Sequence, residues 1–464
     1  MRYKSTRGQV SDLSFTEAVL MGLASDGGLL LPESVPDVSE QLEAWQSLSY
    51  PELAKNIMGL YIGDIAAAEL GGIIDKSYST FTNEKVTPLN RLGETYILEL
   101  FHGPTLAFKD VALQFLGNVF EHILKETKGE LNIVGATSGD TGSAAIAGVR
   151  GKDNINIFIM FPEGKTSELQ ELQMTSVLDA NVHNLAVDGS FDDCQALLKS
   201  VFSDLPFKAQ YQLGAVNSVN WARILAQIVY FFSAYFQLKE QQPQTHKVDF
   251  CVPTGNFGDI FAGYLARKMG LPIDRLILAT NANDILARFF KTGRYEREEV
   301  NFTHSPAMDI QVSSNFERYL YYALEGSSAK VSEFMESFAN TGAASIEFNT
   351  PSFDQTFAAG SATNEQTLAA IQEIYEVHGY ITDPHTAVGL HVGKTLRRTE
   401  VPIIHLSTAH PAKFDAAIKL ALPKVHPVHP TLEALKGAKT RKSKLEVDEG
   451  ALKHFIKKQR APER

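Results

Sequence analysis

The sequence predicts an α/β protein with two open, mostly parallel lobes and a small N-terminal domain. Beyond residue 96, short apolar runs alternate with longer helical patterns, which is typical of βαβ units in a parallel sheet with helices on both faces. The 464 residues are enough for two or three domains, and 44% hydrophobic with 21% charged residues is the composition of an ordinary globular protein. We therefore expect a main body without disorder.

The N-terminal domain is expected over residues 1–92. Two helical patterns, at 16–24 and 50–59, flank a piece at 24–32 that is rich in Gly and ends in Pro. Clusters of Gly and Pro are strong turn signals. The residues alone therefore predict a small helical domain here.

The two lobes are expected over residues 93–240 and 241–430, followed by a basic tail over 431–464. The tail is expected to be solvated and partly mobile, with a short helix at 451–457. A long helix is expected at 219–238. Six short apolar runs are candidate strands of the sheets, at 131–136, 155–161, 183–187, 248–252, 275–279 and 402–406.

Charge and composition exclude several classes of function. The formal net charge of −11 argues against a general nucleic-acid binder, which needs a basic surface for the phosphate backbone. No apolar run reaches the length that spans a bilayer, and no apolar segment follows the basic residues at the start as in a secretory signal, so we expect a cytoplasmic protein. The expected partner is a small molecule, and the sequence leaves a monomer and a homodimer open.

The two cysteines, Cys194 and Cys251, have neither the number nor the spacing of a disulfide framework or a zinc site. We expect both to be small core residues, and we expect no metal.

The first motif places one lysine in an apolar turn. Residues 101–110 read FHGPTLAFKD, so turn-forming residues precede Lys109 and an apolar helical pattern follows it. Burial there disfavours the charged form of an amine, and a neutral amine can condense with a carbonyl compound. The alternative is a Lys109–Asp110 pair at a helix start, with both side-chain ends in water.

This motif resembles the lysine motif of threonine synthases, which are fold-type II pyridoxal phosphate (PLP) enzymes. The resemblance implies that Lys109 carries PLP as a Schiff base and serves as the catalytic base. It also implies the fold-type II architecture of two α/β lobes. The turn-rich piece at 24–32 resembles the opening of the same family, whose members carry a small N-terminal domain.

The second motif is a glycine-flanked loop that follows the candidate strand at 248–252 and precedes a helical pattern. This order directs backbone N–H groups at one point and creates an anion site, although a tight turn without a ligand is the alternative. The loop resembles the phosphate loop of threonine synthases. The resemblance implies that the PLP phosphate is bound by Gly255, Asn256, Phe257, Gly258 and Asp259.

Two features of this loop depend on its conformation. Gly258 is expected to adopt a positive φ, which a larger residue would resist. If Asp259 contacts the phosphate through its backbone N–H, its carboxylate matters little, whereas contact through the side chain would repel the phosphate.

The third motif is GATSGDTGS at 135–143, which follows a candidate strand and opens a helix of small residues. The Walker pattern fails because no Lys-Ser or Lys-Thr follows, and the dinucleotide pattern fails on glycine spacing. Hydroxyl and N–H groups at a helix N-terminus suit a carboxylate. The motif resembles the loop that binds the substrate α-carboxylate in threonine synthases, which implies substrate binding by Thr137, Ser138, Gly139, Asp140 and Thr141.

The fourth motif places Thr408 at the end of a buried strand. On the residues alone, a Ser/Thr cap of the following helix is the alternative. The segment STAHPAKF at 407–414 resembles the segment of threonine synthases whose Thr bonds the pyridine nitrogen of PLP, and the matching position is Thr408.

A further segment, 214–223, is also similar to this family and offers candidate ligands for a substrate phosphate in Asn217, Ser218 and Arg223. A guanidinium forks onto phosphate oxygens. Helix capping by Ser218 and an Arg223 on a solvated face are the competing explanations.

Together the resemblance implies a carbon–oxygen lyase that acts on a phosphate ester. The implied reaction is the PLP-dependent conversion of O-phospho-L-homoserine and water to L-threonine and phosphate, the last step of threonine biosynthesis. Two alternatives remain: a PLP enzyme similar to serine/threonine dehydratases, and a catalytically silent relative that binds ligands.

Overall fold

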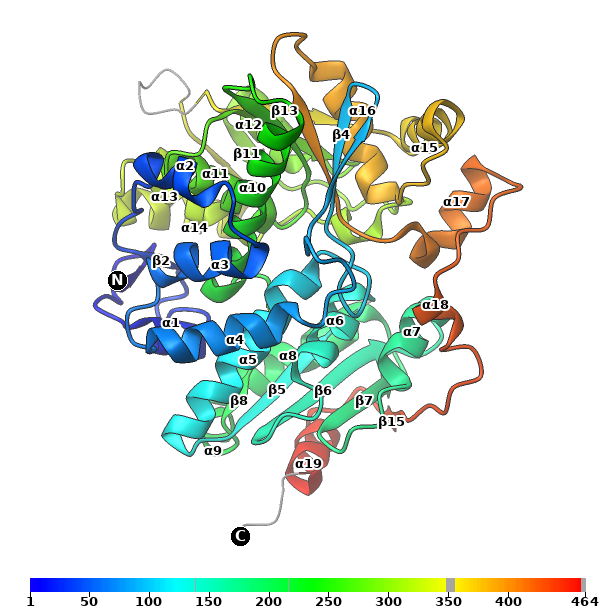
Figure 1. Ribbon diagram of the computed structural model, residues 1–464. Helices are drawn as coiled ribbons and strands as arrows, with labels where there is room; N and C mark the ends of the chain where they lie inside the picture. The colour runs from blue at the N-terminus through cyan, green and yellow to red at the C-terminus, as the bar shows by residue number, and fades with distance from the viewer. Residues whose placement is uncertain (138, 216, 348–354, 460–464) are drawn as a thin grey trace. The chain divides into compact units, whose positions relative to one another are not determined.

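The computed structural model describes residues 1–137, 139–215, 217–347 and 355–459. The chain forms two compact units, each built from separate stretches of the sequence (Figure 1). Unit 1 comprises Met1–Asp75, Phe81–His102 and Ser218–Pro427, and unit 2 comprises Lys76–Thr80, Gly103–Asn217 and Val428–Arg464. The expected boundaries at residues 92, 240 and 430 stay a prediction.

Unit 2 contains a parallel sheet of five strands in the order β15-β7-β6-β5-β8. The central strands are buried almost throughout, which explains why they read as continuous apolar runs. The three strands expected in this part of the chain are confirmed within a residue at each end. The strands are β5 (Leu131–Ala136), β6 (Ile155–Pro162), β7 (Val182–Val187), β8 (Leu213–Gly214) and β15 (Ser443–Leu445).

Two glycines let the first two helices of unit 2 cross at close range. A Cβ on Gly117 would lie 2.0 Å from the carbonyl oxygen of Gly148, and a Cβ on Gly148 would lie 2.5 Å from that of Leu113. This contact positions α6 beside α5. The helices of unit 2 are α5 (Lys109–Thr127), α6 (Asp140–Val149), α7 (Glu168–Thr175), α8 (Phe191–Ser203), α9 (Leu205–Gln210), α18 (Pro430–Glu433) and α19 (Glu449–Gln459).

Most described residues of the C-terminal tail are exposed, as expected, but the tail is also anchored to unit 2. β15 adds to the sheet beside β7, and α19, which confirms the helix expected at 451–457, packs on the same apolar core. Leu445, Leu452 and Ile456 are buried there with Phe158. Charged residues flank these three apolar residues, such as Lys444 before Leu445 and Lys453 after Leu452, so the composition of the tail does not reveal that it packs on the core.

Unit 1 contains a six-stranded sheet in the order β13-β10-β9-β14-β4-β3, parallel except for the edge pair of β3 and β4. The candidate strands at 248–252, 275–279 and 402–406 are confirmed as β9, β10 and β14. The bounds are β3 (Leu89–Leu92), β4 (Thr95–Glu99), β9 (Val248–Pro253), β10 (Ile273–Thr280), β13 (Phe357–Ser361) and β14 (Ile403–Ser407).

The long helix α10 (Trp221–Gln241) confirms the helix expected at 219–238 and packs against α3 and α11. It is buried from Trp221 to Leu238, because it lies in the interior of unit 1. The other helices are α1 (Phe15–Met21), α2 (Leu42–Trp45), α3 (Tyr50–Gly59), α4 (Ala67–Tyr78), α11 (Gly258–Lys268), α12 (Ile285–Thr292), α13 (Phe316–Ala323), α14 (Ser328–Thr341), α15 (Asn364–His378), α16 (Pro384–Leu396) and α17 (Asp415–Ala421).

The two N-terminal helices expected at 16–24 and 50–59 are confirmed as α1 and α3. Each begins with a capping box, formed by Ser14 with Glu17 and by Ser49 with Glu52. Nearby, the short strands β1 (Tyr3–Ser5) and β2 (Leu30–Pro32) pair antiparallel.

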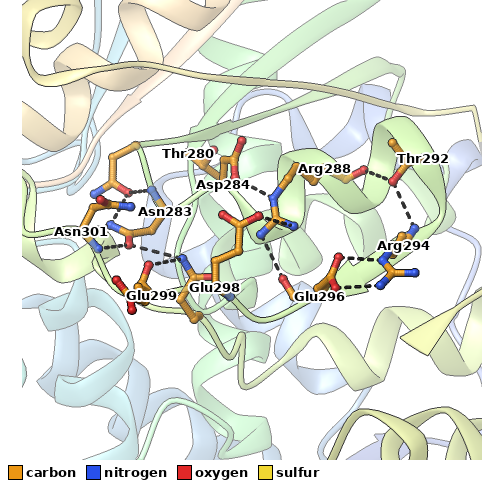
Figure 2. A network of polar contacts seen from close by, with 12 residues as sticks. Thr280, Asn283, Asp284, Arg288, Thr292, Arg294, Glu296, Glu298, Glu299 and Asn301 are labelled. Atoms are coloured by element: carbon orange, nitrogen blue, oxygen red, sulfur yellow. Dashed lines mark hydrogen bonds and ion pairs between the residues drawn. The ribbon is translucent and has the colours of Figure 1, made fainter. Parts of the chain in front are cut away.

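Polar contacts hold the segment that follows α12. Figure 2 shows Arg288, whose Nε donates to Asp284 Oδ1 at 2.8 Å and whose Nη2 donates to the carbonyl oxygen of Glu296 at 2.9 Å. Arg294 donates to both carboxylate oxygens of Glu296, at 2.6 and 2.7 Å. These bonds fix β11 (Arg294–Glu296), which pairs antiparallel with β12 (Ala343–Ser345), beside α12.

Cys194 and Cys251 are buried free cysteines, which confirms the expectation of two core residues. Burial raises the pKa of the Cys194 thiol to about 11. Among the described residues, no helix is both long and apolar enough to cross a membrane.

Candidate active site

Lys109 is the first residue of α5, and its side chain is only 11% exposed. Its Nζ lies 3.9 Å from Asp140 Oδ2, at the start of α6, and 5.2 Å from the ring centroid of Phe108. The alternative of a solvated Lys109–Asp110 pair is wrong, because Asp110 is fully buried and Lys109 nearly so. The lysine is a sheltered amine beside the Asp140 carboxylate.

The turn before Lys109 is held by Asp110. The backbone N–H of Thr105 donates to Asp110 Oδ2 at 2.8 Å, and the Thr105 hydroxyl donates to Oδ1 at 2.7 Å. Leu106 adopts a left-handed φ of +61°, and a Cβ on Gly103 would lie 2.5 Å from Asp110 Cβ. A charge-assisted network therefore imposes the backbone shape that presents Lys109.

Thr137 shapes the loop that opens α6. Its Oγ1 accepts the backbone N–H groups of Gly139 and Gly142, both at 3.1 Å. Gly142 has no room for a side chain, because a Cβ there would lie 2.4 Å from Thr137 Cγ2. The result is a tight loop at a helix N-terminus, with Thr141 half-buried beside it; Ser138 lies outside the described residues.

Gln170, on α7, contacts this loop although it lies outside the sequence motif. Its Nε2 donates to Asp140 Oδ1 at 3.1 Å, and a Cβ on Gly139 would lie 2.6 Å from its Oε1. Asp140 is therefore held between Lys109 and Gln170. No local pattern signals Gln170, because it lies 30 residues further along the chain.

The glycine-flanked loop lies between β9 and α11, in unit 1. Its left-handed residue is Phe257, with a φ of +61°, so the expectation of a positive φ at Gly258 is wrong. Gly255 lies in a crowded place, because a Cβ there would lie 3.2 Å from the carbonyl oxygen of Ala307, closer than an ordinary van der Waals contact.

The carbonyl groups of this loop are bound by a segment that the sequence motifs missed. Ser313 Oγ donates to the carbonyl oxygen of Gly255 at 2.8 Å, and the backbone N–H and Nδ2 of Asn315 donate to that of Asn256, both at 3.0 Å. With its carbonyl groups held in this way, the loop leads into the N-terminus of α11, whose first N–H groups lack intrahelical partners. This is the arrangement of an anion site.

Asp259 turns its side chain toward α10. The hydroxyl of Tyr230 donates to Asp259 Oδ1, while Oδ2 has no hydrogen-bond partner among the described residues. Burial raises the pKa of Asp259 to about 7. This geometry favours the alternative in which Asp259 would meet a phosphate through its backbone N–H.

Arg223, in the first turn of α10, is buried, and burial lowers its pKa to about 10. The alternative that placed it on a solvated face is therefore wrong. The alternative of a helix cap by Ser218 is also wrong, because Asn220 Oδ1 caps α10 and Ser218 Oγ lies 2.7 Å from Ser314 Oγ. Asn217 is half-buried just before this segment.

Thr408 follows β14 and is buried. Its backbone N–H donates to Thr386 Oγ1 at 3.1 Å, and the Thr386 hydroxyl donates to Asp383. The helical turn that follows, η3 (Pro411–Phe414), is capped by the side chain of His410, so the alternative of a cap by Thr408 is wrong.

These groups fit PLP. They supply a sheltered primary amine, a loop suited to a phosphate in which Gly255 leaves little room for a side chain, and a hydroxyl residue at the end of a buried strand. The carboxylate loop of unit 2 adds N–H groups for a substrate acid.

Comparison with known proteins agrees with this chemistry. Residues 2–78 match the family model of the threonine synthase N terminus, residues 81–402 match that of pyridoxal-phosphate dependent enzymes, and residues 386–456 match that of the threonine synthase C-terminal region. The chain is 49% identical to the threonine synthase of Schizosaccharomyces pombe over 90% of this chain and 89% of that protein, and 49% identical to that of Pseudomonas aeruginosa over 91% and 90%.

A solved structure gives the same result. The crystal structure of PLP-bound threonine synthase from Brucella melitensis superposes with a TM-score of 0.96, at 44% identity, over 99% of this chain and all of that chain. These matches confirm the fold-type II architecture, the PLP cofactor and the lyase class expected from the sequence. The chain belongs to the threonine synthase family of PLP-dependent enzymes.

Proposed function

We propose that this enzyme converts O-phospho-L-homoserine and water to L-threonine and inorganic phosphate. The observation that supports this best is the sheltered Lys109 amine, 3.9 Å from Asp140, within a chain that matches threonine synthases almost from end to end. The cytoplasmic location and the choice between monomer and homodimer stay predictions.

Lys109 carries PLP and moves the proton at the substrate Cα. When bound, PLP supplies an electron sink for the negative charge that remains after this proton leaves. The freed amine takes the Cα proton and later returns it, and its placement beside Asp140 favours a cationic state after it has accepted that proton. A second proton leaves Cβ, phosphate leaves Cγ, and Cγ takes up a proton to become the methyl group. Water adds its hydroxyl group to Cβ and gives its proton to the departing phosphate, so that atoms and charge balance.

Gly255 to Asp259 bind the cofactor phosphate through backbone N–H groups, and Thr408 bonds the pyridine nitrogen. A neutral hydroxyl, unlike a carboxylate, does not hold that nitrogen protonated.

Thr137, Ser138, Gly139, Asp140 and Thr141 bind the substrate α-carboxylate. Because the Asp140 carboxylate already faces Lys109 and Gln170, it is the N–H groups and hydroxyls of this loop that suit the acid.

Asn217, Ser218 and Arg223 bind the substrate phosphate. The burial of Arg223 supports this role, since a desolvated guanidinium forms strong charge-assisted hydrogen bonds with phosphate oxygens.

A phosphate-release assay tests the proposal. The enzyme should release phosphate from O-phosphohomoserine far faster than it forms keto acid from serine or threonine. Comparable keto-acid formation from threonine would assign it to the dehydratases, and inactivity toward all three substrates, with PLP bound, would indicate a silent relative.

A further inference from the structure

A cavity of about 430 Å³ lies inside unit 2, beside the turn that precedes Lys109. Its walls come from α5, α6, α7, the segment 76–80 and the start of the C-terminal segment at α18. None of the described residues assigned above to PLP or to the substrate is among these walls. The cavity is therefore a separate candidate site.

Two buried glutamines face this cavity with one unsatisfied atom each. Gln114, on α5, is 5% exposed, and Gln173, on α7, is 8% exposed. Within the described parts of the chain, neither Gln114 Nε2 nor Gln173 Oε1 has a hydrogen-bond partner. Leaving a buried polar atom unpaired is unfavourable, so this wall offers a hydrogen-bond donor and an acceptor to a ligand that enters the cavity.

The other amide atom of Gln173 is already committed. Its Nε2 donates to the carbonyl oxygen of Thr105 at 3.2 Å, which fixes the orientation of the side chain and leaves Oε1 as the free acceptor.

The cavity is also positively charged. Lys76, Arg150 and Lys152 contribute to its walls. Lys76 and Lys152 share one carboxylate, that of Glu121, at 2.6 and 3.2 Å, and Arg150 pairs with Asp179 at 2.6 Å. These three cations thus share two carboxylates. Burial lowers the pKa of Lys152, although the Glu121 carboxylate opposes this effect. A second anion beside Lys152 would therefore further stabilise its charged form.

We propose that this cavity binds a small carboxylate that also carries a hydroxyl or amino group. The carboxylate accepts a hydrogen bond from Gln114 Nε2 and lies near Lys152, and the hydroxyl or amino group donates to Gln173 Oε1. This pairing satisfies both buried amides and the excess positive charge together, which water alone does not achieve.

The cavity wall is continuous with the candidate active site through hydrogen bonds. Gln173 binds the carbonyl group of Thr105, and Thr105 in turn holds Asp110, the neighbour of Lys109. On the wall formed by α6, Ser143 Oγ donates to the carbonyl oxygen of Asp140 at 3.1 Å. A ligand in this cavity therefore contacts residues that are hydrogen-bonded to the turn before Lys109, through which it could act as an effector.

Three matched probes test the proposal on the full-length PLP-loaded enzyme. Glycerate has the carboxylate and the hydroxyl groups, propionate lacks the donor, and glycerol lacks the charge; none of them carries an amine that could condense with PLP. Titration calorimetry should detect one glycerate per chain, with propionate and glycerol at least about tenfold weaker, a difference of about 1.4 kcal/mol.

Variants then locate the site. Gln114→Leu removes the unpaired donor Nε2 and keeps a side chain of similar size, so the fold should persist while glycerate binding weakens at least about tenfold. Lys152→Met should weaken it similarly and gives a second, independent test. Lys125→Met changes an exposed lysine of α5 that is not a cavity wall, and binding should stay within about twofold.

Three results would overturn the proposal: no binding of glycerate at about 10 mM, equal binding of propionate, or unchanged binding of glycerate in both Gln114→Leu and Lys152→Met.

Discussion

Replacing Asp259 with Asn tests the electrostatics of the candidate phosphate loop. Asp259 is buried, the Tyr230 hydroxyl donates to its Oδ1, and burial raises its pKa to about 7. Asn has nearly the same shape, keeps an acceptor for Tyr230 and cannot ionise. The variant therefore removes the titration of this group and little else.

The sign and size of the effect follow from linkage. In the unfolded chain an Asp titrates near ~3.9, so between about pH 4 and pH 7 the folded protein binds more protons than the unfolded chain. The stability that this group contributes is complete below the unfolded pKa and is lost as pH rises through the folded pKa. A shift of about 3 units corresponds to ~4 kcal/mol in total, of which about 2 to 3 kcal/mol falls between pH 5 and pH 8.

We therefore expect the unfolding free energy of Asp259→Asn, measured relative to that of the wild type, to rise by about 2 to 3 kcal/mol as the pH is raised from 5 to 8. Urea unfolding followed by tryptophan fluorescence measures it, because both tryptophans, Trp45 and Trp221, are buried in unit 1 with Asp259. The apoenzyme is used, since PLP binding would add its own contribution.

The control is Asp75→Asn, which removes a carboxylate that is 55% exposed and paired with Lys55. The difference in unfolding free energy between Asp75→Asn and the wild type should change by less than about 0.5 kcal/mol over the same pH range. If the difference for Asp259→Asn is equally constant, burial does not hold Asp259 protonated and the reasoning fails. A relative loss at pH 8 would mean that the ionised carboxylate is stabilised, again against it.

Three further substitutions test the assigned roles. Lys109→Ala should bind PLP only noncovalently. Its rate should fall by more than about a hundred- to ten-thousand-fold, the range typical of losing a proton-transfer group. Borohydride reduction of the wild type should place the phosphopyridoxyl mass on the peptide containing Lys109, and a mass on another lysine would contradict the assignment. Gly255→Val should lower PLP affinity while the apoenzyme keeps its circular dichroism, because a Cβ would lie 3.2 Å from the carbonyl oxygen of Ala307; unchanged affinity would mean that this loop does not bind the phosphate. Arg223→Ala should weaken the binding of substrate and of inorganic phosphate by about 1.5 to 3 kcal/mol with an unchanged cofactor spectrum, and an unchanged KM would remove Arg223 from the substrate site.

The predictions from sequence succeeded where local pattern carries the information. The candidate strands were predicted because a strand buried on both faces needs a continuous apolar run, as in β6 and β9. The lysine motif could be identified from the sequence because turn residues directly precede Lys109 and an apolar helical pattern directly follows it. The packing of the tail on unit 2 was not predicted because the apolar residues that it buries, such as Leu445 and Leu452, are few and stand among charged residues.

The sequence by itself determined the class of the fold and the family, and it predicted candidate site residues, since strand runs, turn residues and motif spacing are properties of neighbouring residues. Only the tertiary structure decided the surroundings of those residues. Gln170 beside Asp140, Ser313 and Asn315 on the loop carbonyl groups, and Tyr230 against Asp259 all come from distant segments. Burial and hydrogen-bond partners arise when such segments pack together, and because they set the charge state of a carboxylate such as Asp259, that state cannot be read from its neighbours in the chain.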